Sequence, residues 1–195
     1  MALGRPRGFD LDIAIQRARD VFWRNGFDAT SLATLAAVIG VHKPSLYAAY
    51  GDKRELYLAA YNAYQNDAGQ LVASALGLPQ FREALSAFFA ADLDLFLADD
   101  GRGCFMFATA IPLAPNDADI AERARKSIKA LSTAIAERVA QADRARELSQ
   151  AILPAAASDI ILSTHIALAN RARSGEGRAP LEQTTKLVID MICAG

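Results

Sequence analysis

The sequence has few cysteines and histidines, and it lacks a long apolar run. Two cysteines, Cys104 and Cys193, cannot by themselves form a disulfide framework or a zinc site. Two histidines, His42 and His165, offer neither an H-E-x-x-H pattern nor a nucleophile–base pair. No apolar run reaches the ~20 residues of a membrane span, and the N-terminal "MALGRPRGFD" lacks the apolar core of a signal peptide. We therefore expect a cytoplasmic protein that is not an enzyme and has no metal or cofactor.

Glycine and proline are also sparse, with 12 and 7 residues in 195, while alanine is abundant. This composition favours helices. The chain is 52% hydrophobic and 22% charged, which is typical of a globular protein. Apolar residues recur with helical spacing, and no segment shows sustained strand-like alternation. The sequence therefore predicts an all-α fold.

Charge is distributed unevenly along the chain. The first 60 residues contain eight Lys/Arg and six Asp/Glu, whereas the remaining 135 contain thirteen Lys/Arg and sixteen Asp/Glu. The whole chain has a net charge of −1, so a uniformly basic nucleic-acid binder is excluded. The positive sign of the first third is the one expected of a segment that meets phosphate.

Residues 10–51 show the pattern of three short helices. Asp10 is a candidate cap for the first, which ends at Asn25-Gly26, and Thr30 is a candidate cap for the second, which ends at Gly40. Pro44 lies in the first turn of the third helix, where its missing N–H is tolerated. The Gly40-Val41 turn between two helices is typical of a helix-turn-helix, although similar corners also occur in ordinary helical packing.

Three segments make the pattern specific: "GRPRGFD", "VFWRNGFDATSLATLAAVIGV" and "KPSLYAAYGDKRELY". They resemble the N-terminal DNA-binding domain of the TetR/AcrR family of bacterial transcriptional regulators. The resemblance implies a helix-turn-helix DNA-binding domain over 1–52 and a helical ligand-binding and dimerisation domain over 53–195. It also implies a homodimer that binds a palindromic DNA operator, usually as a repressor, and leaves it when a small molecule binds. The alternative is a helix-turn-helix protein without an effector that acts architecturally or through a protein partner.

The helix-turn-helix region contains the candidate DNA contacts. Hydroxyls, ammonium groups and arginines are typical partners of phosphates and of the minor groove. The arginines could instead form a solubilising tail, and His42 is a poor helix cap where the family commonly has serine. The predicted DNA-binding residues are Arg5, Arg7, Thr30, His42, Lys43, Ser45, Tyr47, Tyr50 and Lys53.

An aromatic stripe lies on the predicted helix over 79–98, and Asp92 falls in its middle. A carboxylate there must be paired, hydrated or protonated. The partner could be an arginine or a hydroxyl from another helix, or a ligand that is apolar and carries a cationic or donor group. His165, on a helix that is apolar nearly all round, is either a satisfied core or dimer-seam residue or a second ligand contact. The candidate ligand-binding residues are Phe88, Phe89, Asp92, Phe96, Phe105, Phe107 and His165.

Two helices predicted over 155–174 and 180–193 contain apolar stripes with small residues that permit close approach. Two such helices from each protomer would form a four-helix seam, although the stripes could instead be buried within one protomer. The candidate dimer residues are Ile160, Thr164, Ala167, Leu168, Arg171, Leu181, Thr185, Val188, Ile189 and Ile192.

Overall fold

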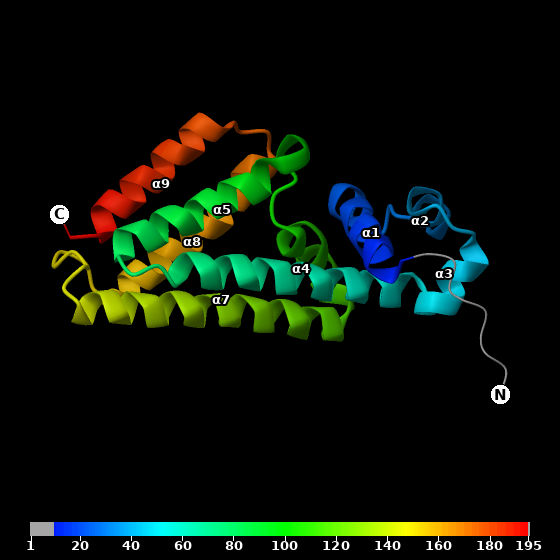
Figure 1. The fold of residues 1–195 in the computed structure, drawn as a ribbon, viewed down its shortest axis with the longest axis horizontal. Coiled ribbons are helices and arrows are strands. Elements are labelled where there is room, and N and C mark those ends of the chain that lie inside the picture. Colours follow the sequence, from blue (N-terminus) through cyan, green and yellow to red (C-terminus); the bar gives the residue numbers. More distant parts are fainter. Residues whose placement is uncertain (1–9, 195) are drawn as a thin grey trace. The chain divides into compact units, whose positions relative to one another are not determined.

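The computed structural model describes residues 10–194, and within this range every regular element is a helix, apart from an isolated bridge between Leu148 and Cys193. The predicted all-α fold is confirmed. The chain divides into an N-terminal unit, Met1–Asn66, and a C-terminal unit, Asp67–Gly195, and helix α4 contributes to both. No helix in the described range is long and apolar enough to cross a membrane. The helices in chain order (Figure 1) are α1 (Leu11–Asn25), α2 (Leu32–Ile39), α3 (Lys43–Tyr50), α4 (Lys53–Leu76), α5 (Phe81–Gly101), the π-helix η1 (Met106–Ala110), α6 (Ile111–Leu113), the 3-10 helix η2 (Ala114–Asn116), α7 (Ala118–Arg144), α8 (Pro154–Arg173) and α9 (Arg178–Ile192).

The start of α1 follows the sequence prediction. The Asp10 carboxylate accepts hydrogen bonds from the backbone N–H groups of Asp12 (2.8 Å) and Ile13 (3.2 Å), which satisfies two of the free donors at the helix start. At the other end, Gly26 N–H donates to the Phe22 carbonyl. The inner face of α1 is buried at Ala14, Ala18, Val21, Phe22 and Trp23.

The predicted cap of α2 is wrong by one residue. Ser31 is the N-cap, and its hydroxyl accepts from Thr34 N–H at 3.0 Å. Thr30 is 1% exposed, and its hydroxyl donates to the Gly26 carbonyl at 2.6 Å. Sequence alone did not separate two adjacent hydroxyl residues, because only packing decides which of them turns inward.

The turn between α2 and α3 is built by Gly40, whose φ of 83° and ψ of 33° lie in the left-handed region that a side chain disfavours. Arg17 on α1 donates to the Ile39 carbonyl at 2.9 Å and so satisfies an acceptor at the end of α2. Leu35, Ile39 and Leu46 are buried beneath this turn. The helix-turn-helix is therefore held by apolar packing and by a long-range hydrogen bond.

Aromatic contacts form the rest of the N-terminal core. Phe22 on α1 meets Tyr57 on α4 edge to face at a centroid distance of 5.3 Å, and Trp23 meets Tyr64 in the same way at 5.0 Å. Both tyrosines belong to the first half of α4, within the N-terminal unit. That half of α4 thus completes the core of the helix-turn-helix.

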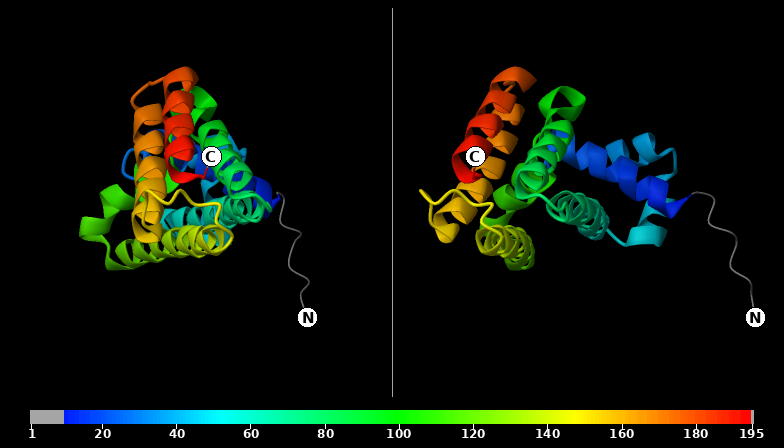
Figure 2. Two further views of the ribbon diagram at one scale, coloured as in Figure 1. Left: turned by 90° about the vertical axis from the view of Figure 1, so that its left-hand side faces the viewer. Right: turned by 60° about the vertical axis from the view of Figure 1, so that its left-hand side comes forward.

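In the C-terminal unit, α5 packs against α8 and α9, and α8 packs against α7 and α9. Figures 1 and 2 show α9 lying alongside α5 and α8 from each direction. The predicted aromatic stripe of α5 is confirmed as core. Its buried members are Phe81, Leu85, Phe88, Phe89 and Phe96.

The segment that follows α5 departs from a regular helix. The helix kinks after Ala98, and Asp99 and Asp100 have φ of 49° and 61°. A Cβ on Gly101 would collide with the Ala172 carbonyl oxygen of α8, so this position needs glycine. Beyond Gly103 the chain forms the π-helix η1 in place of an ordinary α-helical turn.

Candidate functional site

Helix α3 presents the main candidate DNA surface. His42 occupies its N-cap position but makes no side-chain cap bond, and Pro44 lies in the first turn, as the sequence predicts. Leu46 is 2% exposed and fixes the inner side of the helix. The other face is open to solvent at His42, Lys43, Pro44, Ser45, Tyr47 and Ala48.

Two of the predicted DNA contacts, Thr30 and Tyr50, donate their hydroxyl groups to backbone carbonyls of the protein itself. Thr30 is buried and donates to Gly26, so it has no surface to offer phosphate. Tyr50 is half-buried and donates to the Leu11 carbonyl at 3.0 Å, linking the end of α3 to the start of α1. These two hydroxyls position the helices instead of facing outward.

Lys53 also has an internal role. Its ammonium donates to the Phe27 carbonyl at 3.0 Å and lies 4.1 Å from the centroid of the Phe27 ring. An ammonium has three N–H donors, so two remain for an external acceptor. Arg5 and Arg7 lie outside the described residues.

Two exposed hydroxyl residues are not among the predicted DNA contacts. Ser31 and Thr34 are exposed at the N-terminus of α2, and their hydroxyl oxygens are 2.9 Å apart. A helix N-terminus with exposed hydroxyls is suited to phosphate. The available signal in the sequence is the serine three residues before a threonine at the helix start, next to Thr30, which has a similar hydroxyl.

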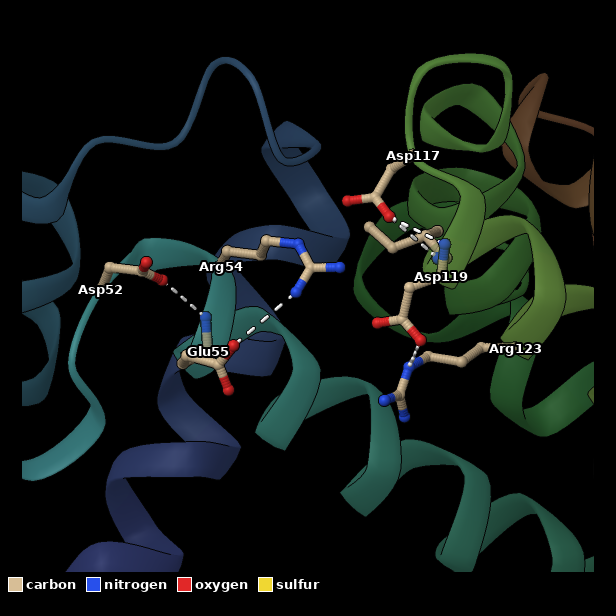
Figure 3. A network of polar contacts seen from close by, with 7 residues as sticks. Asp52, Arg54, Glu55, Asp117, Asp119 and Arg123 are labelled. Carbon is tan, nitrogen blue, oxygen red and sulfur yellow. Dashed lines mark hydrogen bonds and ion pairs between the residues drawn. The ribbon is translucent and has the colours of Figure 1, made fainter.

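Within the segment Gly51-Asp52-Lys53, Asp52 has a structural role at the start of α4. Asp52 accepts from the Glu55 N–H at 2.8 Å and caps the start of α4, and Arg54 pairs with Glu55 at 3.6 Å (Figure 3). The start of α7 in the C-terminal unit is capped in a similar way by Asp117, which is also drawn in Figure 3. Asp52 therefore fixes the position at which Lys53 begins α4.

In the C-terminal unit, the partner of Asp92 is His165. The Nδ1 atom of His165 on α8 lies 2.9 Å from Oδ2 of Asp92 on α5. Phe88 stacks on the imidazole at a centroid distance of 5.8 Å, and Phe96 meets it edge-on at 5.3 Å. The sequence left open an internal partner, an arginine or a hydroxyl, and a ligand; in the structure Asp92 has an internal partner from another helix, and it is a histidine.

Burial sets the protonation tendency of this pair. Removal from water raises the pKa of the Asp92 carboxyl, and the imidazole of His165 opposes this shift only in part. Asp92 and His165 are 7% and 8% exposed. Phe88, Phe89, Phe96 and Phe105 are also buried, while Phe107 is half-buried. Most of the predicted ligand residues are thus buried around a polar pair.

Both cysteines are buried, and within residues 10–194 neither forms a disulfide. Burial raises the pKa of the Cys193 thiol, which disfavours its reactive thiolate form. Residues 10–194 contain no group of three His, Cys, Asp or Glu side chains arranged to hold a metal ion.

Most of the predicted dimer stripe faces the interior of its own protomer. Leu168, Leu181 and Ile192 are fully buried. Arg171 forms a two-pronged ion pair with Glu176, with both N–O distances 2.6 Å, which anchors the α8–α9 connection. The other buried members, at 7–8% exposure, are Thr164, Thr185 and Ile189.

A different face of the same two helices remains open. On α9, Leu187 is 64% and Met191 is 49% exposed, and both are absent from the predicted stripe. Ala167 on α8 is exposed, and Ile160 and Val188 are half-buried. The helical periodicity of the sequence indicates an apolar stripe on each helix, but it does not show that α5 packs against both helices and that α8 and α9 pack against each other.

The N-terminal helix-turn-helix with an exposed third helix, followed by a helical unit, defines a helix-turn-helix regulator. A sequence profile of the bacterial regulatory proteins of the tetR family matches residues 14–60. YezE, an uncharacterized HTH-type transcriptional regulator of Bacillus subtilis (strain 168), is 30% identical over 134 residues, which are 68% of this chain and 69% of YezE. The HTH-type transcriptional repressor ComR of Escherichia coli (strain K12) is 36% identical over 121 residues, which are 60% of this chain and 58% of ComR.

A solved structure extends the similarity to nearly the whole chain. A cysteine mutant of the TetR family transcriptional regulator CifR, complexed with 26-bp double-strand operator DNA, is 27% identical. The superposition has a TM-score of 0.79 and covers 97% of this chain and 100% of that chain. The chain belongs to the TetR family. Its relatives are transcriptional regulators and not enzymes, as the sequence predicted.

Proposed function

We propose that this chain is a transcriptional repressor that binds a palindromic DNA operator as a homodimer and releases it when a small molecule binds the C-terminal unit. The main support for DNA binding is the exposed face of α3. His42, Lys43 and Ser45 lie on this face, and the buried Leu46 holds the opposite side of the helix against the core. An α-helix fits the major groove, and these side chains can reach base edges. The solved operator complex of CifR and the repressor names of the relatives support this proposal.

Base contacts and phosphate contacts have different consequences, and this difference tests the proposal. We expect Lys43→Ala and His42→Ala to change which sequences the protein selects from a random duplex library. Tyr47→Phe removes a hydroxyl that contacts phosphate, so it should weaken binding to all sequences alike. Lys126 on α7 is exposed in the C-terminal unit, and Lys126→Ala is the matched control for loss of a surface cation. Equal losses on selected and random DNA for all these α3 variants would contradict the assignment of α3 as the reading helix.

Two considerations support a homodimer: a palindromic operator needs two recognition helices, and α8 and α9 expose an apolar face. Two recognition helices must lie about 34–36 Å apart to enter successive major grooves on one face of DNA. We assign the protomer interface to the exposed apolar face defined by Ala167, Leu187 and Met191, flanked by the half-buried Ile160 and Val188. This face would pair with itself across a two-fold axis.

Effector control rests on α4, which begins at Lys53 and continues into the C-terminal unit. A ligand that shifts this helix would change the spacing of the two recognition helices, with a coupling of about 1–3 kcal/mol. We place this effector near Asp92 and His165, where an apolar molecule with a cationic or donor group would compete for the buried carboxyl.

The alternative is a helix-turn-helix protein without an effector, and the burial of the aromatic residues around Asp92 is compatible with it. A thermal-shift screen with the full chain separates the two. A protein with an effector site is stabilised by its ligand, and that ligand should then release DNA. A compound that binds tightly while operator affinity stays constant would contradict the coupling through α4.

A further inference from the structure

A groove between α5 and α9 lies outside the residues assigned above to DNA and to the buried pair. It has a volume of about 480 Å³, within the usual range for small-molecule sites. Ala90 and Leu93 on α5 and Ile189 on α9 form its apolar floor. The groove lies on the side of α9 that faces α5, away from the exposed Leu187 and Met191.

The charges around this floor are segregated. At one end, Arg82 on α5 and Lys186 on α9 share a single carboxylate, Asp190, at 2.7 and 2.5 Å. This end has one positive charge in excess. Hydrogen bonds and ion pairs to both cations lower the pKa of Asp190, so the carboxylate stays ionised at neutral pH.

The opposite end has the reverse balance. Arg178 and Glu182 on α9 line this end and lie 3.5 Å apart, and Arg178 also bonds at 2.7 Å to Asp94 on α5, a carboxylate next to the lining residue Leu93 and outside the lining itself. One cation is thus shared by two carboxylates. This end has one negative charge in excess. Because Arg82 pairs with the end of α9 and Asp94 with its start, the two helices run antiparallel and the two ends lie at opposite ends of the groove.

Helix geometry gives the separation of the two ends. The negative end is centred between residues 178 and 182 of α9, and the positive end lies between residues 186 and 190, eight residues further along. At the helical rise, this corresponds to about 12 Å. Ion pairs in solvent contribute little to stability. Stabilisation of the fold therefore does not explain why the excess positive charge lies at one end of the groove and the excess negative charge at the other.

We propose that the α5–α9 groove binds an elongated small molecule with an anionic group at one end, an apolar chain of about 12 Å, and a cationic group at the other end. The anionic group pairs with Arg82 and Lys186, and the cationic group pairs with Asp94 and Glu182. The chain between them covers Ala90, Leu93 and Ile189. This site is independent of operator binding and goes beyond the function proposed above.

Calorimetric titration of the full chain with three probes tests the charge pattern. The unbranched ω-aminodecanoate has both charged ends, decanoate lacks the cation, and decylamine lacks the anion. We expect saturable binding of ω-aminodecanoate that is about fivefold tighter than that of either probe with one charge. Tetra-alanine is a fourth probe, and its free termini span a similar length. Tighter binding of tetra-alanine than of ω-aminodecanoate would indicate a peptide ligand, and the reverse order would indicate an aliphatic one.

Variants at the two ends make the test specific. Arg82→Gln should remove the advantage of ω-aminodecanoate over decylamine, and Glu182→Gln should remove its advantage over decanoate. Both side chains lie at the surface, and Lys186→Gln provides a second variant at the positive end if Arg82→Gln folds poorly. Lys126→Gln on α7, which removes an exposed cation outside the groove, should leave the order of the three probes unchanged. DNA affinity should be the same in all four variants, so failure here is separable from failure of the repressor proposal. Absence of saturable binding, or an order of probes that neither end variant changes, would overturn the site.

Discussion

The pair formed by Asp92 and His165 should be energetically coupled, and a double-mutant cycle measures this coupling. Asp92→Val leaves the imidazole without its partner, and His165→Leu leaves the carboxyl without its partner, in a region where both residues are less than a tenth exposed. An unsatisfied buried polar group costs about 1–3 kcal/mol, and an uncompensated buried charge costs about 3–5 kcal/mol. We expect each single variant to lose about 3 kcal/mol. The double variant, which strands neither group, should lose about 2 kcal/mol less than the sum of the two.

Thermal or urea unfolding at pH 7 provides these values. For a chain of this size, a loss of about 3 kcal/mol lowers Tm by roughly 6–12 °C, so the single variants remain folded at room temperature. The change of packing volume at each position occurs in both the single and the double variant and cancels in the cycle. Additive losses would show that the 2.9 Å contact contributes no coupling, and the interpretation of the pair would be wrong.

The pH dependence of the same variants tests the protonation of Asp92. Because burial raises its pKa above the ordinary value of 3.8, the native state retains a proton that the unfolded chain has released. The stabilisation from Asp92 is therefore full below about pH 3.8 and is lost as the pH rises through the native pKa. The difference in the free energy of unfolding between the wild type and Asp92→Val should therefore shrink as the pH rises. The same should hold for the difference between His165→Leu and the double variant, which also differ only at Asp92. A difference that grows with pH would mean that the pKa of Asp92 is lowered in the native state.

Three further predictions concern the dimer face, the helix cap and the segment after α5. Leu187→Glu and Met191→Glu should convert a dimer to monomers in sedimentation experiments, whereas Leu71→Glu, an exposed leucine on α4, should leave the assembly intact; a dimer in all three variants would exclude this face. Ser31→Ala should lower the free energy of unfolding by about 1 kcal/mol, because Thr34 N–H loses its acceptor, and unchanged urea unfolding would show that water replaces the cap. Gly101→Ala should cost more than about 1 kcal/mol, since it combines a positive φ with a collision against Ala172; a melting temperature equal to that of the wild type would show that the chain relaxes there without cost.

The elements of the N-terminal unit could be predicted because their signals are local. Asp10 caps α1, Gly40 makes the turn and Pro44 opens α3, and each acts on residues within one helical turn of itself. The cap of α2, predicted as Thr30 and observed as Ser31, shows the limit of such local signals. Both hydroxyls could cap α2, and only the burial of Thr30 against the rest of the unit decides between them.

The C-terminal unit shows a different limit. Asp92 and His165 each stand out in the sequence as polar residues on an apolar helix face, but 73 residues separate them. Helical periodicity gives the face of each residue within its own helix, and it does not give the relative rotation and translation of α5 and α8. The same limit explains the dimer stripe, since the pattern of Leu181, Thr185 and Ile192 predicts burial without identifying the surface that covers them.

The polar residues of the helix-turn-helix region serve its internal geometry as much as its surface. Arg17 on α1 donates to Ile39 on α2, and Tyr50 on α3 donates to Leu11 on α1. Lys53 at the start of α4 donates to Phe27 in the segment between α1 and α2, so all three long side chains reach carbonyl oxygens distant in sequence. Such links fix the angle of α3 before DNA arrives, which lowers the cost of ordering on binding. Replacement of Tyr50 or Lys53 would therefore change both the surface and the geometry that presents it. Lys43, which lies on the exposed face of α3, separates the two effects, and this makes Lys43→Ala the sharper test of DNA recognition.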